Sequence, residues 1–127
     1  MTGSPYSDAV LAHFREPRYA GSFPAGTRGV SRGEAGSSDE GRLVRIELTL
    51  AGDAVDELRF KAFGCPATIA AASYVAGALR GCPRARAEAL GAEEIARELD
   101  LRAERAAAAE VVAGALQAAL AASRRAT

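Results

Sequence analysis

In the stretch from Phe60 to Ser73, F-K-A-F-G-C-P-A-T-I-A-A-A-S, a cysteine lies between a segment with the apolar pattern of a strand and a segment with that of a helix. Before it, apolar residues alternate from Leu58 to Ala62, which is typical of a strand with one buried face. After it, apolar residues recur at helical spacing, and Pro66 stands where a first helical residue needs no N–H. Cys65 is therefore predicted between a strand and the first turn of a helix. Backbone N–H groups and the helix dipole favour an anion there, so its thiolate should form more easily than that of a free cysteine.

Two strands with alternating apolar and polar residues are predicted before this helix. They cover Val44 to Leu50 and Val55 to Phe63, and the turn Ala51-Gly52-Asp53 joins them. Strands joined by so short a turn should pair antiparallel. The preceding residues, 24–40, are rich in Gly, Ser, Arg and Glu and are predicted mostly as loop, with a short strand around Thr27–Arg32.

Helices are predicted at both ends of the chain. The expected ranges are 8–16, 66–80, 83–90, 92–99 and 104–123, with Ser7 as the first N-cap and Gly81 as a C-cap. Strands followed by helices predict an α+β fold, a small antiparallel three-stranded sheet with helices packed on one face. The length and the lack of a linker predict one domain, 1–127.

Composition narrows the range of functions. Sixteen basic and sixteen acidic residues cancel, so neither nucleic acid nor a membrane surface is an expected partner. No apolar run is expected to span a membrane and Met1–Pro5 lacks a signal-peptide core, so a cytoplasmic location is expected. The two cysteines are too few for a disulfide framework. With a single histidine and no nucleophile beside it, no catalytic triad is predicted, and the protein is not expected to be an enzyme.

The run Phe60–Ser73 resembles the F-x-x-x-G-C-x-x-x-x-A-x-x-S segment of the NifU/IscU-type iron–sulfur cluster assembly scaffolds. The segment Tyr6–Phe23 is similar to the opening helix of the same family, the NifU N-terminal domain family, and to its H-x-x-x-P-R-x-x-G signature. The residues at the matching signature positions are His13, Pro17, Arg18 and Gly21. The resemblance runs from residue 6 to about residue 120 and implies a SufE/NifU-like fold.

The resemblance also implies where cluster ligands would stand. In the family, a first cysteine and a nearby aspartate come from a C-G-D loop before the second strand. Here Ser37 takes the place of that cysteine if Asp39 matches the aspartate, and a one-residue slip would use Ser38 and Glu40 instead. Cys65 matches the second cysteine. Asp39 and Cys65 are therefore the remnant ligand positions for a cluster or a metal.

The last two ligand positions fall at the start of the final helix, where the family has a His-Cys pair. Ala107 and Ala108 stand there, and neither side chain can bind a metal. One thiolate and one carboxylate fall short of a four-ligand zinc or cluster site. The chain is therefore expected to be a divergent member that holds no cluster stably alone, and that binds iron or an iron–sulfur cluster only with ligands from a partner.

The resemblance implies partners as well. A cysteine desulfurase or another iron–sulfur assembly protein is the expected partner. The stretch that chaperones recognise in the family, L-P-P-V-K, corresponds to Leu101–Arg105, where both prolines are missing and the sequence favours helix. Chaperone docking through this stretch is therefore not expected.

Three functions remain open on these grounds. The first is an accessory or regulatory protein of iron–sulfur cluster assembly. The second is a SufE-like persulfide acceptor in which Cys65 takes sulfur, and the third is a non-catalytic docking module. Cys82, in a break between two helices, is predicted to be a spectator thiol or a redox partner of Cys65. His13 is predicted to hydrogen-bond to the following loop rather than to bind metal.

Overall fold

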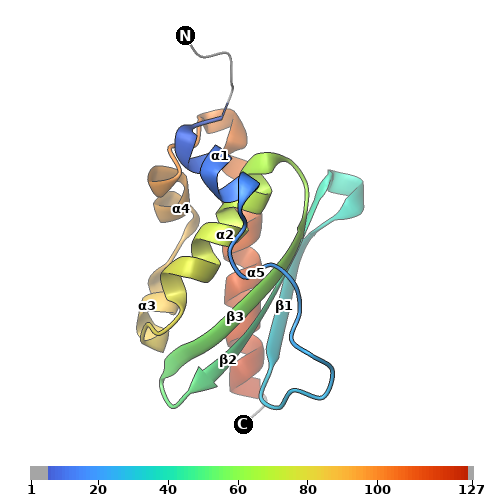
Figure 1. The fold of residues 1–127 in the computed structure, drawn as a ribbon, viewed down its shortest axis with the longest axis vertical. Coiled ribbons are helices and arrows are strands. Elements are labelled where there is room, and N and C mark those ends of the chain that lie inside the picture. Colours follow the sequence, from blue (N-terminus) through green and yellow to red (C-terminus); the bar gives the residue numbers. More distant parts are fainter. Residues whose placement is uncertain (1–5, 126–127) are drawn as a thin grey trace.

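A three-stranded antiparallel sheet in the order β1-β2-β3 organises the computed structural model, which describes residues 6–125. In chain order the elements are α1 (Asp8–Arg15), β1 (Ser31–Ser37), the short 3-10 helix η1 (Ser38–Glu40), β2 (Arg42–Ala51), β3 (Ala54–Phe63), α2 (Pro66–Leu79), α3 (Arg84–Ala89), α4 (Ala92–Glu98), a second 3-10 helix η2 (Ala103–Arg105) and α5 (Ala106–Arg125). Figure 1 shows α5 behind the strands with α2 beside it, and α1 across the upper end of α2.

The core lies between the sheet and these helices. Val44, Ile46 and Leu48 of β2 are fully buried, as is Leu58 of β3. They face the apolar sides of α2 and α5, whose small alanines allow close packing. The prediction of an α+β fold with helices on one face of a three-stranded antiparallel sheet is confirmed.

The first strand lies in the region expected to be mostly loop. β1 covers Ser31–Ser37 rather than the short strand expected around Thr27–Arg32. Its sequence, S-R-G-E-A-G-S, carries no apolar alternation, because its buried face packs against the backbone of α5. A Cβ on Gly33 would lie 2.2 Å from the backbone nitrogen of Ala119. The loop prediction for residues 33–37 was wrong because glycine here serves close packing and not a turn.

The long C-terminal helix contradicts the expectation that no segment could span a membrane. Ala103–Ser123 is long and apolar enough to do so by length and composition. Half of the most apolar part of this segment is buried inside the fold, and the helix packs against β1 and β2. This burial is what the central helix of a protein core requires, since its apolar face already has a partner.

Candidate functional site

Cys65 occupies the N-cap of α2, immediately after β3 ends. Pro66 opens the helix, and the Cys65 carbonyl accepts the N–H of Thr68 at 2.9 Å. Gly64 turns the chain with φ +152°, and a Cβ on it would lie within 3.2 Å of Thr68 and Arg42. The side chain of Cys65 is partly exposed and its thiol is free. The structure thus places the thiol at the strand–helix junction, as the sequence predicts.

The surroundings of Cys65 favour its thiolate. Partial burial is the largest influence and by itself would raise the pKa of the thiol. The Thr68 hydroxyl, whose Oγ1 lies 3.6 Å from Sγ, the N–H groups of Thr68 and Ala67, and the charge of Arg105 together outweigh it. The pKa of Cys65 is therefore lowered from its ordinary value of 9.0. A partly exposed thiol with a lowered pKa can act as a nucleophile or as a soft metal ligand.

The other predicted ligand positions lie at the same end of the molecule. Figure 1 shows the β3–α2 junction, η1 and the start of α5 all toward its upper end. An open hollow of about 440 Å³ lies between η1 and the start of α5. It is lined by Glu40 of η1, Arg42 of β2 and Ala107 of α5, among others. The resemblance therefore maps the ligand positions onto neighbouring elements of the fold.

The side chains at those positions do not form a metal site. Ser37 ends β1, and its hydroxyl accepts the N–H of Glu40 at 3.2 Å, which makes it a helix cap. Asp39 is exposed in η1, and Ala108 is only 2% exposed. Within residues 6–125, no three His, Cys, Asp or Glu side chains come together in a way that could hold a metal ion. The residues present do not fit a cluster.

Basic side chains adjoin the site instead. Arg42 lines the hollow, and Arg105 lowers the pKa of Cys65 while its guanidinium lies 4.7 Å from the ring centre of Tyr6. The Nε atoms of both arginines are buried without a hydrogen-bond partner. The sequence analysis missed this role for Arg105, although the stretch compared with L-P-P-V-K ends in a cation in both.

His13 belongs to a polar link between α1 and α2. Its Nδ1 lies 2.8 Å from Oγ of the fully buried Ser73, and the same oxygen accepts the N–H of Arg18 at 2.8 Å. The hydroxyl proton of Ser73 is then available to donate to Nδ1 of a neutral imidazole. The prediction that His13 bonds to the following loop was wrong, because its partner is Ser73 of α2, which also accepts the N–H of Arg18 from that loop. Among residues 6–125, His13 belongs to no group of side chains that could hold a metal ion.

The His13 link should make the stability of the protein fall as the pH drops below about 6.5. Burial and the charge of Arg18 lower the pKa of His13 from its ordinary value of 6.5. The unfolded chain therefore takes up a proton first as pH falls, and stability that is present above pH 6.5 is lost below it. Urea unfolding at pH 7.5, 6.5 and 5.5 should show this loss in the wild type and a weaker one in His13→Gln. Equal losses in the two proteins would contradict the link.

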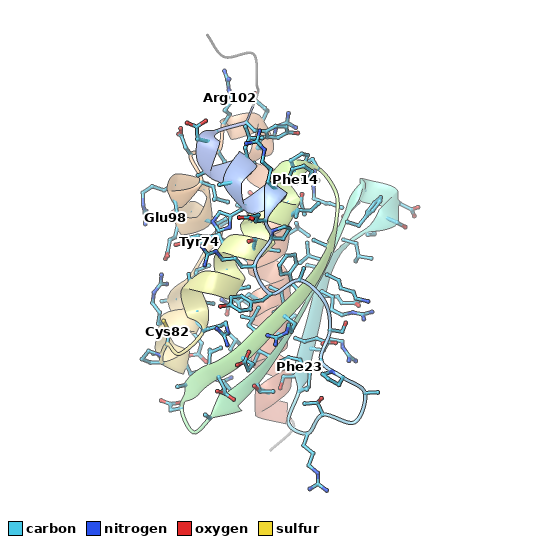
Figure 2. The ribbon with its side chains drawn as sticks, viewed as in Figure 1. Phe14, Phe23, Tyr74, Cys82, Glu98 and Arg102 are labelled. Carbon is cyan, nitrogen blue, oxygen red and sulfur yellow. The ribbon has the colours of Figure 1, made fainter. Side chains whose placement is uncertain are left out.

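Cys82 lies at the opposite end of α2 from Cys65. Its thiol donates to the carbonyl of Ala78 at 3.3 Å, and Figure 2 shows it where α2 gives way to α3. The 14 residues of α2 separate the two cysteines, which at 1.5 Å per residue is roughly 21 Å. A direct redox pair between them, one of the two predictions for Cys82, is therefore wrong.

The structure defines a class of small α+β proteins with a cysteine at the junction of the last strand and the following helix, and comparison with known proteins identifies the family. The family model described as the NifU-like N terminal domain matches residues 5–127. The chain therefore belongs to the NifU-like N-terminal domain family, the family that its sequence resembles.

The chain is also similar to named iron–sulfur cluster assembly proteins. The chain is 31% identical over 97 residues to an Escherichia coli iron–sulfur cluster assembly scaffold protein IscU, covering 76% of both chains. It is 34% identical over 76 residues to a Plasmodium falciparum iron–sulfur cluster assembly protein IscU, covering 60% of this chain and 47% of that one. The matched region spans half of a fission yeast mitochondrial iron–sulfur cluster assembly protein.

Solved structures share the fold. A candidate iron–sulfur cluster assembly scaffold protein for the SUF system from Fervidobacterium islandicum aligns with a TM-score of 0.73 at 17% identity, covering 91% of this chain and 96% of that chain. The N-terminal part of a nitrogen-fixing NifU-like protein from Brucella abortus aligns with a TM-score of 0.55 at 16% identity, covering 92% and 83%. At such identities these structures support the fold alone.

Proposed function

We propose that this protein serves iron–sulfur cluster assembly as an accessory or regulatory NifU/IscU-type protein that does not hold a cluster with its own residues. One observation carries the proposal: the resemblance puts Ser37, Ala107 and Ala108 at three family ligand positions, and Cys65 supplies the one thiol at the site. A cluster needs several soft ligands, and neither a capping hydroxyl nor a methyl group is one. We place the protein in the cytoplasm and propose no enzymatic activity of its own.

The partner in this proposal is a cysteine desulfurase or another iron–sulfur assembly protein. Iron or a cluster would enter the site only when that partner supplies the missing ligands around Cys65. The open hollow beside η1 and α5 leaves this end of the molecule accessible to such a partner. Docking of an assembly chaperone to Leu101–Arg105 is not part of the proposal, because the stretch lacks both prolines.

A second candidate, persulfide acceptance by Cys65, is favoured by the lowered pKa of this thiol. The Cys65 thiolate would attack the outer sulfur of a persulfide on a donor cysteine. The new S–S bond forms at Cys65 while the donor S–S bond breaks, and the donor cysteine leaves as a thiolate. The transferred sulfur keeps its proton and its oxidation level, so no further reductant is required. This step needs no metal ligand.

Anaerobic reconstitution with ferrous iron and sulfide tests the proposed function. We expect neither the wild type nor Cys65→Ser to retain iron in proportion to protein after desalting, measured by bound-iron analysis and visible absorbance. Stoichiometric cluster in the wild type that disappears in Cys65→Ser would overturn the proposal. Colourless, iron-free protein that also shows no sulfur transfer to Cys65 would exclude persulfide acceptance and leave two functions, the accessory protein that needs a partner's ligands and the non-catalytic docking module.

A further inference from the structure

β3 leaves part of its outer edge without a partner. At Phe60 the edge is occupied, because the N–H of Gly21 donates to the Phe60 carbonyl at 2.7 Å and the Phe60 N–H donates to the Tyr19 carbonyl at 3.2 Å. Backbone groups of every second residue in a strand point the same way, so the N–H and C=O of Ala62 also point away from β2. In the described chain, no backbone group from outside the sheet pairs with them. An unpaired edge of this kind can accept another extended chain.

A hollow of about 470 Å³ adjoins this edge. Its apolar lining comprises Pro17, Ala20, Gly21, Phe60, Ala62 and Ile69. One wall of the hollow is the loop that contains Ala20 and Gly21. This loop is held in place at Phe23, whose N–H donates to the buried carboxylate of Glu47 at 2.9 Å, and the same carboxylate accepts Nε–H of Arg32 at 2.8 Å. The hollow is thus part of the folded structure, and its size suits one or two apolar side chains.

Lys61 is the charged residue of this hollow and the single lysine in the sequence. It is exposed, and it also lines a second hollow of about 300 Å³ beside Phe63, which is 57% exposed. The other charged residues of that second hollow, Glu34 and Arg45, pair with each other at 2.7 Å. Lys61 makes no ion pair within the described residues, so the uncompensated charge between the two hollows is positive.

We propose that the edge of β3 at Ala62 binds an extended segment of a partner protein that presents an apolar side chain next to an acidic one. The segment continues the strand pairing that ends at Phe60, its apolar side chain enters the larger hollow, and its carboxylate pairs with Lys61. Main-chain bonds supply affinity in this mode, and the hollow and the charge supply selectivity. The inference goes beyond the proposed function, since it requires no chemistry at Cys65.

Three synthetic seven-residue peptides test this proposal with the full-length chain. One alternates leucine and aspartate, the second alternates leucine and lysine, and the third is the acidic peptide methylated on alternate backbone nitrogens. Nitrogen-15 NMR titration should show the acidic peptide shifting amide signals of Lys61–Phe63, Ala20, Gly21 and Ile69. The basic peptide should bind at least several-fold more weakly because its lysines repel Lys61. The methylated peptide should also bind at least several-fold more weakly because every second main-chain N–H donor is missing.

Matched variants of the lysine complete the test. Lys61→Glu should weaken binding of the acidic peptide roughly fivefold or more, while Lys61→Arg should leave it nearly unchanged. Since Lys61 is exposed, both variants should keep the wild-type NMR spectrum outside the edge. Equal binding of acidic and basic peptides, or shifts confined to another surface, would overturn the proposal. So would dimerisation in sedimentation experiments that Lys61→Glu abolishes, because the occupant of the edge would then be a second copy.

Discussion

Replacing Gly33 by alanine should lower the free energy of unfolding by roughly 2–3 kcal/mol, a large effect for the addition of one methyl group. A Cβ at this position would lie 2.2 Å from the nitrogen of Ala119, 2.5 Å from the carbonyl oxygen of Ala115 and 2.6 Å from the carbonyl carbon of Ala118. All three are backbone atoms of α5, so no side chain can turn aside to make room. β1 and α5 would have to separate, which opens the core along the helix. Urea unfolding at pH 7.5 measures the change.

Gly114→Ala is the matched control for this prediction. It adds the same methyl group to α5 on the side that faces β1, where the nearest atom is Cβ of Ala35 at an ordinary contact distance of 3.4 Å. Because alanine favours a helix over glycine, this variant should gain roughly 0.5–1 kcal/mol. A lower free energy of unfolding in Gly33→Ala and a higher one in Gly114→Ala would locate the effect at the β1–α5 contact. An unchanged free energy of unfolding in Gly33→Ala would show that β1 and α5 are not in close backbone contact at this position.

The same glycine explains how far the fold could be predicted from the sequence. β2 and β3 were predictable because apolar side chains alternate along them with the period of a strand, and α2 was predictable because Pro66 opens a long run of mostly apolar residues, nearly all of them buried. β1 was not, since its buried residues are Ser31 and Gly33, the glycine lying against the backbone of α5, while Arg32 and Glu34 are exposed. Its pairing with β2 and the contact with α5 create the strand, and neither is visible in the local sequence.

At the candidate site, the position of Cys65 in the fold could be predicted from the sequence, but its interactions with distant residues could not. The order strand, Gly64, Cys65, Pro66 was enough to place the thiol at a helix N-terminus. The influence of Arg105 on that thiol was not predictable, because the two residues are 40 positions apart and meet only through the packing of η2. The link from His13 to Ser73 was hidden for the same reason, since it joins two helices across 60 residues.

Cys65→Ser should reduce transfer of labelled sulfur from a cysteine desulfurase to background, while Cys82→Ser should retain it. A serine hydroxyl is not ionised at neutral pH and forms no persulfide, so the loss should be complete. Cys82 lies at the far end of α2 and takes no part. The measurement is sulfur-35 bound to the protein after incubation with the desulfurase and labelled cysteine, resolved without reductant. Equal labelling of both cysteine variants would remove Cys65 from the chemistry.

The charge of Arg105 provides the finer test of the same thiol. Because Arg105 and the N–H groups of α2 lower the pKa of Cys65, removing the guanidinium should raise it, and Arg105→Gln should react with iodoacetamide roughly twofold more slowly at pH 7. Arg102→Gln is the matched control, since Arg102 is 67% exposed and lies beside Glu104. If both variants slow alkylation equally, the effect reflects net charge alone. A slower reaction in Arg105→Gln only, with slower sulfur transfer, would connect the lowered pKa to function.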